Sequence, residues 1–258
     1  MVNFRTPISL LPEELDLYLE HGWYRMGQRI FTVDYIFISE WIRVFWLRFR
    51  MDRFEFGKKQ NQLISRNSRF QTAVLPLKMT LEIEELYALY RKSIDFEASN
   101  SASELLFDEV YTGEILHNVY DSYMIQVRDG QKLIAVGVFD LGKETMAGIV
   151  NFYHPEYKKF SLGKFLILKK MEYAIGQNLP WYYPGYIGHN LSKFDYKLDP
   201  GIEAAEILEP FDGIWLAYKA GLVEEITENQ RSLFFPEEED DDNDLDLENF
   251  DGDVKKLR

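Results

Sequence analysis

The spacing of apolar and polar residues in the first third of the chain predicts helices that alternate with strands. Leucines at four-residue spacing predict a helix over about 12–21. Aromatic and β-branched residues over 23–31 and 34–49 favour strands. A polar, basic helix is expected over 56–67, and an amphipathic helix begins at Thr80.

The second half of the chain has the pattern of a sheet with a central helix. Two alternating apolar runs, 123–128 and 132–139, flank Asp129-Gly130, which is a strong hairpin signal. A strand, a helix and a strand follow, at 147–153, 162–175 and 181–183. This order predicts an α+β (mixed α/β) fold of the acyltransferase kind.

The pattern divides the chain into three segments. We place a domain boundary near residue 78, between a smaller α+β N-terminal domain (1–78) and an acyltransferase-like domain (79–220). The remaining segment, 221–258, is an acidic tail with 14 acidic and 4 basic residues, and it carries most of the net charge of −14. Its run 236–246 has too little apolar surface to offset the entropy of ordering, so we expect disorder. A calcium loop is the weaker alternative, because the glycine and final glutamate of an EF-hand are missing.

One part of the N-terminal segment is basic despite the acidic total. Residues 43–69 have a net charge of +6, with aromatic residues between the basic ones. Such a patch suits RNA phosphates and bases, with Lys58, Lys59 and Arg66 as candidate contacts. A half-buried strand with one solvated face explains the same pattern, and composition alone favours this explanation slightly.

Composition excludes several classes of protein. The 258 residues contain 46% hydrophobic positions, which is ordinary for a soluble folded chain. The absence of cysteine excludes disulfides, thiolate metal sites and a cysteine nucleophile. No secretory signal begins the sequence, so a cytoplasmic protein without membrane contact is expected. Walker A, G-x-S-x-G, H-E-x-x-H and G-x-G-x-x-G signatures are absent, which argues against kinases, hydrolases and dehydrogenases.

The candidate chemistry lies between Gly137 and Lys197. Ser161-Leu162-Gly163 begins a helix, where backbone N–H groups bind phosphate or carbonyl oxygen; an ordinary helix cap is the simpler explanation. Asp140 ends an apolar strand and could orient or deprotonate an amine, or simply be a turn residue. Tyrosines and lysines of 182–197 suit an adenosine end with phosphate; a surface loop is the alternative.

Six motifs in one order resemble the arginyl-tRNA-protein transferases, including the bacterial aspartate/glutamate leucyltransferases, over roughly 10–200. They are Leu11-Pro12-Glu13-Glu14-Leu15, Gly22-Trp23-Tyr24-Arg25-Met26-Gly27, Phe56-Gly57-Lys58-Lys59-Gln60 with Arg66-Asn67, Ala135–Asp140, Phe152–Pro155 through Ser161-Leu162-Gly163, and Tyr182–Tyr186 followed by Lys193 and Tyr196-Lys197. The resemblance implies a GNAT-like second domain and transfer of Arg or Leu from aminoacyl-tRNA to a protein N-terminus in an N-degron-type pathway. It implies no cofactor.

The chain departs from this family at several positions. The family's N-terminal cysteine cluster is missing, which predicts that no metal is bound. His154 and Pro184 stand at motif positions where the family has Asp and Leu. An acetyl-CoA-dependent acetyltransferase is one alternative function, although the region before the central helix has only one glycine. A module that binds N-termini without catalysis is the other.

The expected site follows from the motifs. Asp140 is the expected catalytic residue. The expected substrate contacts are Arg25, Ser161, Leu162, Gly163, Tyr183, Tyr186, Lys193, Tyr196 and Lys197. The expected partners are aminoacyl-tRNA, through Lys58, Lys59 and Arg66, and acceptor protein N-termini.

Overall fold

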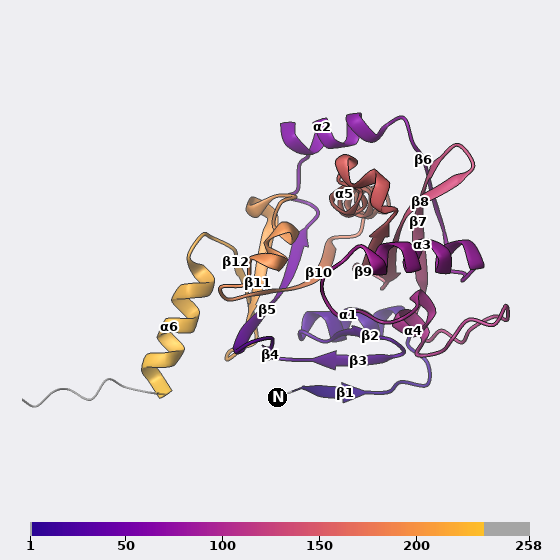
Figure 1. Ribbon diagram of the computed structural model, residues 1–258. Helices are drawn as coiled ribbons and strands as arrows, with labels where there is room; N and C mark the ends of the chain where they lie inside the picture. Colours follow the sequence, from indigo (N-terminus) through magenta and orange to yellow (C-terminus); the bar gives the residue numbers. More distant parts are fainter. Residues whose placement is uncertain (1, 235–258) are drawn as a thin grey trace, which may run out of the picture.

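A large mixed sheet forms the centre of the protein (Figure 1). The computed structural model describes residues 2–234, without the side chains of residues 192, 193 and 230–234. The nine strands have the order β12-β11-β5-β10-β9-β8-β7-β6, with β4 paired to β5 off this path. They are β4 (Tyr35–Phe37), β5 (Trp41–Arg50), β6 (Gln71–Pro76), β7 (Ser122–Asp129), β8 (Lys132–Leu141), β9 (Thr145–Tyr153), β10 (Trp181–Gly188), β11 (Ala205–Glu209) and β12 (Ile214–Ala217).

A smaller sheet and a set of helices surround the large sheet. The small sheet has the order β1-β3-β2, formed by β1 (Asn3–Arg5), β2 (Tyr24–Met26) and β3 (Arg29–Thr32). The α-helices are α1 (Pro12–Glu20), α2 (Lys58–Asn67), α3 (Leu81–Lys92), α4 (Ala102–Phe107), α5 (Leu162–Gly176) and α6 (Leu222–Phe234). The short 3₁₀ helices are η1 (Pro155–Phe160), η2 (Ser192–Lys197) and η3 (Ile202–Ala204).

The order of elements from β7 to β10 is the predicted one. Strands β7, β8 and β9 pair antiparallel, and Gly130 in the turn between β7 and β8 has a φ of 59°. Helix α5 then returns the chain along the sheet, so that β10 lies parallel to β9. The predicted α+β (mixed α/β) fold, a sheet with a central helix between two of its strands, is therefore confirmed.

The large sheet runs across the expected domain boundary. Strands β5 and β6, which precede residue 78, pair with β10 and β7, which follow it. The division into domains at this position stays a prediction. Helical structure also extends into the expected tail, because α6 forms and buries Leu222, Val223 and Ile226 against the core. The acidic run 236–246 lies outside the described residues.

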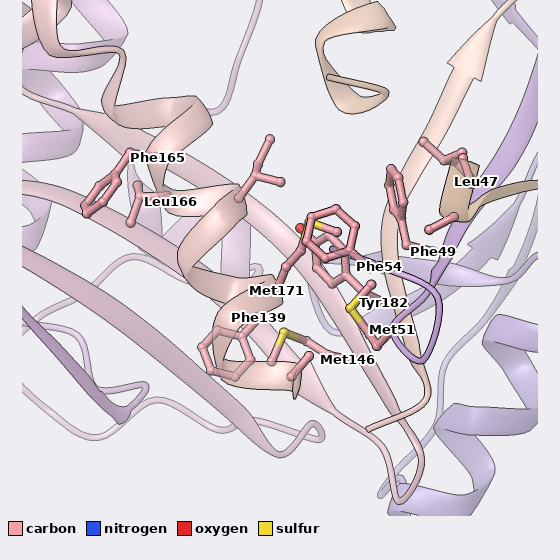
Figure 2. Packing of buried hydrophobic residues seen from close by; sticks show 14 of the residues in the cluster. Leu47, Phe49, Met51, Phe54, Phe139, Met146, Phe165, Leu166, Met171 and Tyr182 are labelled. Carbon is pink, nitrogen blue, oxygen red and sulfur yellow. The ribbon is translucent and has the colours of Figure 1, made fainter. Parts of the chain in front are cut away.

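Different helices cover the two faces of the large sheet. Figure 2 shows Phe139 and Met146 of the sheet beside Met171 of α5. Val138, the next residue along β8, packs instead in the cluster that contains α3 and α4. Successive side chains of a strand point to opposite faces. Asp140 therefore lies on the face of α3 and α4, opposite to α5.

Candidate active site

Strands β9 and β10 run side by side and then separate. Their parallel register ends at Tyr183 opposite Ala147. Beyond this point β9 continues to pair with β8, and β10 continues to pair with β5. The facing backbone groups of two separating strands lose their ladder partners and need others. We call the separating parts, residues 148–153 of β9 and 184–188 of β10, the splay.

Tyr24 of β2 lies where the two strands separate. Its hydroxyl oxygen is 2.7 Å from the carbonyl oxygen of Gly148 and 2.9 Å from that of Tyr183. A hydroxyl has one proton, so it donates to one carbonyl at a time. Burial raises the pKa of Tyr24 well above its usual value, which keeps the hydroxyl a donor. The small sheet is thus joined to the splay at the point where β9 and β10 stop pairing, which we call the closed end.

We expect Tyr24→Phe to lower the free energy of unfolding by about 1–2 kcal/mol, because two buried carbonyl oxygens lose their shared donor while the ring stays. Urea unfolding measures the loss. Tyr18→Phe is the control, since the Tyr18 hydroxyl makes no hydrogen bond among the described residues. An equal loss in both variants would contradict the bridging role of Tyr24.

Each strand of the splay carries a bulge, and a lysine lies against each bulge. The register of β9 against β8 shifts between Gly148 and Val150, and that of β10 against β5 shifts between Tyr182 and Gly185. Lys170 of α5 donates to the carbonyl oxygens of Val138 at 2.7 Å and Val150 at 3.3 Å. Lys197 of η2 donates to the carbonyl oxygen of Tyr186 at 2.7 Å. Burial lowers the pKa of both lysines to about 7.

The first turn of α5 lies against β9. Asn151 reaches the carbonyl oxygen of Gly163 at 3.5 Å, and the Tyr153 ring lies so close that a Cβ at Gly163 would be 3.5 Å from it. Ser161 has a left-handed φ of 54°, and no side chain caps the helix. The backbone N–H groups of the first turn have no partner within the helix. They form a local anion-attracting end beside the splay.

Helix α2 adjoins the start of α5 (Figure 1). Asn67 donates to the carbonyl oxygen of Phe160 at 3.1 Å, and a guanidinium nitrogen of Arg66 lies 3.5 Å from both that oxygen and the Ser161 hydroxyl. The side chains of Lys58 and Lys59 are exposed on the same helix. Two of the sequence motifs, Arg66-Asn67 and Ser161-Leu162-Gly163, therefore meet in space.

The basic patch 43–69 has two parts. Its first part is β5, where Arg48 forms an ion pair with Glu206 at 2.7 Å and lies over the rings of two tryptophans. This part is the half-buried strand that composition favoured. Its second part is the exposed basic face of α2, which remains open to a polyanion.

Aromatic side chains surround Lys197. Its amine lies 5.0 Å from the centre of the Tyr186 ring and 4.7 Å from that of Phe194. The neighbouring Tyr196 of η2 is 40% exposed, and burial raises the pKa of its hydroxyl. Lys193 belongs to η2, and its side chain lies outside the described part.

Asp140 belongs to a buried network on the opposite face of the sheet. Its Oδ1 accepts from Arg25 at 2.8 Å and from the Ser122 hydroxyl at 2.5 Å. Arg25 also donates to the carbonyl oxygens of Gly27 and Leu106. Burial raises the pKa of Asp140, and Arg25 opposes this rise. The carboxylate has no exposed surface, and its Oδ2 has no hydrogen-bond partner.

The expected site residues therefore fall into two groups. Those at the splay or the start of α5 are Ser161, Gly163, Tyr186, Tyr196 and Lys197. Those in the buried network are Asp140 and Arg25. The Tyr183 and Leu162 side chains lie in the core, so only their backbone is available to a substrate. Asp140 cannot touch an acceptor amine in this conformation, and its catalytic role stays a prediction.

Sequence reasoning missed three residues that lie in the splay or contact it. Tyr24 stood within a motif but received no role, and only the separation of the strands reveals what its hydroxyl contacts. Asn151 lies in a strand that reads as ordinary sheet. Lys170 left a detectable signal, because it stands within the apolar stretch of α5 between Leu166 and Met171. A lysine there needs buried acceptors.

Two further properties concern the described residues alone. Among residues 2–234, no group of three or more histidine, aspartate or glutamate side chains is arranged to hold a metal ion. No helix in this range is long and apolar enough to cross a membrane.

The fold is a mixed α/β fold, and sequence comparisons show which proteins the chain is similar to. Residues 82–202 match the model of the arginine-tRNA-protein transferase C terminus. An aspartate/glutamate leucyltransferase of Thiobacillus denitrificans is 28% identical over 64% of this chain and 65% of its own length. Arginyl-tRNA–protein transferase 1 of Dictyostelium discoideum is 29% identical over 54% of this chain and 22% of its own length.

These matches show that the chain is similar to the arginyl-tRNA-protein transferases, and it contains no cysteine. The match spans just under two thirds of the Thiobacillus enzyme. An aspartate/glutamate leucyltransferase of Campylobacter jejuni is matched over 80% of its length, at 24% identity.

Solved structures with similar chain traces are distant. The C-terminal domain of a putative lysylphosphatidylglycerol synthetase from Agrobacterium fabrum has a TM-score of 0.42 and 11% identity, over 74% of this chain and 66% of that one. A glucosamine N-acetyltransferase region of a fungal multidomain protein has a TM-score of 0.38 and 9% identity, over 75% and 21%.

Proposed function

We propose that this protein transfers arginine or leucine from aminoacyl-tRNA to the α-amine of a protein N-terminus in an N-degron-type pathway. One observation carries the proposal. The splay, the uncapped start of α5 and the exposed basic face of α2 lie next to one another. This arrangement offers backbone groups for an ester end and cations for the attached RNA.

The reaction needs few groups from the protein. The acceptor α-amine attacks the ester carbonyl carbon, a C–N bond forms, and the ribose oxygen leaves with a proton. The carbonyl oxygen becomes negative on the way, so it needs fixed donors. The backbone N–H groups of Leu162 and Gly163 are the proposed donors. Tyr186, Tyr196 and the Lys193-Lys197 segment are the proposed contacts of the terminal adenosine.

We propose that Arg25 and Asp140 act as positioning residues. Arg25 holds β2 to β8 through the buried ion pair, and Tyr24 is its neighbour in β2. The pair therefore fixes the strand from which the Tyr24 hydroxyl reaches the closed end of the splay. Rigid support of this kind maintains the geometry on which transfer depends.

The proposed RNA interface predicts a salt-dependent loss of affinity. The triple variant Lys58→Gln, Lys59→Gln and Arg66→Gln should weaken tRNA binding about 10–100-fold at moderate salt. The slope of log affinity against log salt should become shallower by about 2–3, since each phosphate contact contributes roughly one. Fluorescence anisotropy with labelled tRNA at four salt concentrations measures both.

A matched control removes the same charge elsewhere. Lys132, Lys143 and Lys219 have half-exposed or exposed side chains that pair with surface glutamates. Their triple replacement by glutamine should leave the salt slope nearly unchanged. Equal slopes in the two triple variants would remove the RNA contact from α2.

Label transfer tests the proposed activity itself. Charged Arg-tRNA and Leu-tRNA are offered separately to peptides that begin with Asp, Glu, Arg or Lys, and labelled acetyl-CoA is a parallel donor. We expect transfer from at least one tRNA and none from acetyl-CoA. Acetyl transfer alone would make the protein an acetyltransferase. Peptide binding without transfer from any donor would make it a binding module.

A further inference from the structure

Lys197 has surroundings unlike those of a surface lysine. Its side chain is half-buried, and its amine donates to the carbonyl oxygen of Tyr186 on the diverging strand β10. Gly185 makes this approach possible, because a Cβ there would lie 3.2 Å from the lysine nitrogen. The amine therefore stands at the splay itself, with the face of two rings beside it.

Lys197 has no anionic partner. The lysines at 132, 143, 164, 169 and 219 each pair with a carboxylate, whereas Lys197 forms no ion pair among the described residues. Helix η2 packs against β10, whose titratable side chains are Tyr182, Tyr183 and Tyr186. Tyrosine is uncharged near neutral pH, and burial raises the pKa of all three still further. Within η2, the carboxylate of Asp195 is exposed and forms no ion pair with Lys197. It adds to the raised pKa of Tyr218, which burial causes mainly.

Lys170 shows what a lysine does when it has no access to solvent. Burial lowers its pKa, and the charge of Asp140 opposes this shift. Its amine donates to carbonyl oxygens of β8 and β9, and only 1% of the residue is exposed. Its role is to satisfy the bulge. Lys197 has one such acceptor, and the residue is only half-buried. The lone pair of its neutral amine is therefore the one that another molecule can approach.

We propose that the amine of Lys197 is the general base that takes a proton from the α-ammonium group of the acceptor. This proposal rests on the proposed aminoacyl transfer. The lysine amine accepts one proton from the acceptor's α-ammonium group, and the freed α-amine then attacks the ester carbonyl carbon to form the C–N bond. A second proton leaves this nitrogen and goes to the ribose oxygen as the C–O bond breaks, and the lysine releases its own proton to solvent.

The pKa of Lys197 fits this role. At about 7, held there by burial, it leaves roughly half of the molecules with a neutral amine at neutral pH. A free acceptor amine has a pKa of about 8. The base and the protonated acceptor therefore coexist between about pH 7 and 8. The single-turnover rate should rise up to about pH 7 and then level off, because above about pH 8 the acceptor is already a free amine and no longer needs the base.

Substitution of Lys197 distinguishes a role as general base from a role in binding alone. Lys197→Arg keeps a cation that can donate to Tyr186, but it has no neutral amine near pH 7. We expect its single-turnover rate to fall about 100-fold or more, with tRNA affinity within about 3-fold of wild type. What remains of the rate should rise until about pH 8, because only free acceptor amine now reacts. Lys143→Arg, at a 64% exposed side chain, is the control that leaves the rate unchanged.

A chemical measurement tests the proposal without turnover. Competitive labelling of the wild-type protein with acetic anhydride, followed by peptide mass spectrometry, gives the pKa of each lysine. We expect a pKa near 7 for Lys197. A Lys197 pKa above 9, or a Lys197→Arg enzyme with the wild-type rate and pH profile, overturns the proposal. Absence of transfer by the wild type, with Lys197 titrating near 7, instead overturns the proposed function and with it this use of the amine.

Discussion

Arg25→Met is expected to lower the free energy of unfolding by about 3–5 kcal/mol, because it leaves the Asp140 carboxylate buried without its counter-ion. Arg25 Nη1 lies 2.8 Å from Asp140 Oδ1, and the Asp140 side chain has no exposed surface. In a chain of this size the loss corresponds to a fall in Tm of roughly 6–20 °C. Thermal unfolding followed by circular dichroism measures it.

The cost of Arg25→Met should depend on pH. Burial raises the pKa of Asp140 and Arg25 opposes the rise, so without Arg25 the pKa rises further. A carboxyl whose pKa is raised by folding favours the folded state while protonated, and this stability is lost as pH rises. The variant should therefore lose less stability at pH 5 than at pH 8.

An exposed ion pair provides the control for Arg25. Arg29 lies 3.8 Å from Asp108, and both side chains are more than 40% exposed. Arg29→Met should cost less than about 1 kcal/mol, with little dependence on pH between 5 and 8. Equal losses for the two arginine variants would show that burial of the Arg25–Asp140 pair has no energetic consequence.

Gly22→Ala is expected to cost about 2–5 kcal/mol, the sum of backbone strain and overpacking. Gly22 has a φ of +71°, in the left-handed region that side chains disfavour. An added Cβ would also lie 2.6 Å from a Leu208 methyl carbon and 2.8 Å from the Trp46 ring. Both neighbours are buried, so neither can move away freely.

Gly130→Ala separates the two contributions. Gly130 has a φ of +59°, but no atom lies within 4 Å of its added Cβ. This variant should therefore show the backbone strain alone, about 1–2 kcal/mol. Urea unfolding of both proteins gives the difference. A cost for Gly22→Ala no greater than that for Gly130→Ala would contradict the close packing of α1's end against β5 and β11.

Local patterns predicted the elements that depend on local physics. The Asp129-Gly130 turn between alternating runs gave the β7–β8 hairpin, and the apolar face of 162–175 gave α5. The leucine spacing near the N-terminus gave α1. These elements bury a periodic face, and the period is visible in the chain. Helix α4, with six residues, has no such period and was not predicted.

The site could be predicted only in part, because its central feature depends on how distant strands pair. The motif residues at 66, 161–163 and 186–197 do gather at one end of the sheet. Asp140 does not join them. Side chains alternate between the two faces along β8, and Asp140 lies on the same face as Val138, which packs with α3 and α4. The Tyr24 bridge joins residues more than 120 positions apart, which no local pattern encodes.

The proposed site makes a claim that one measurement tests directly. Hydrogen exchange of the full chain would be compared with and without an acceptor minihelix whose terminal adenosine carries leucine or arginine through a stable amide. We expect slower exchange in residues 148–153, 161–165 and 184–197, and no comparable change in the β7–β8 turn. Protection confined to other parts of the protein, with these three segments unchanged, would show that the aminoacyl end binds elsewhere.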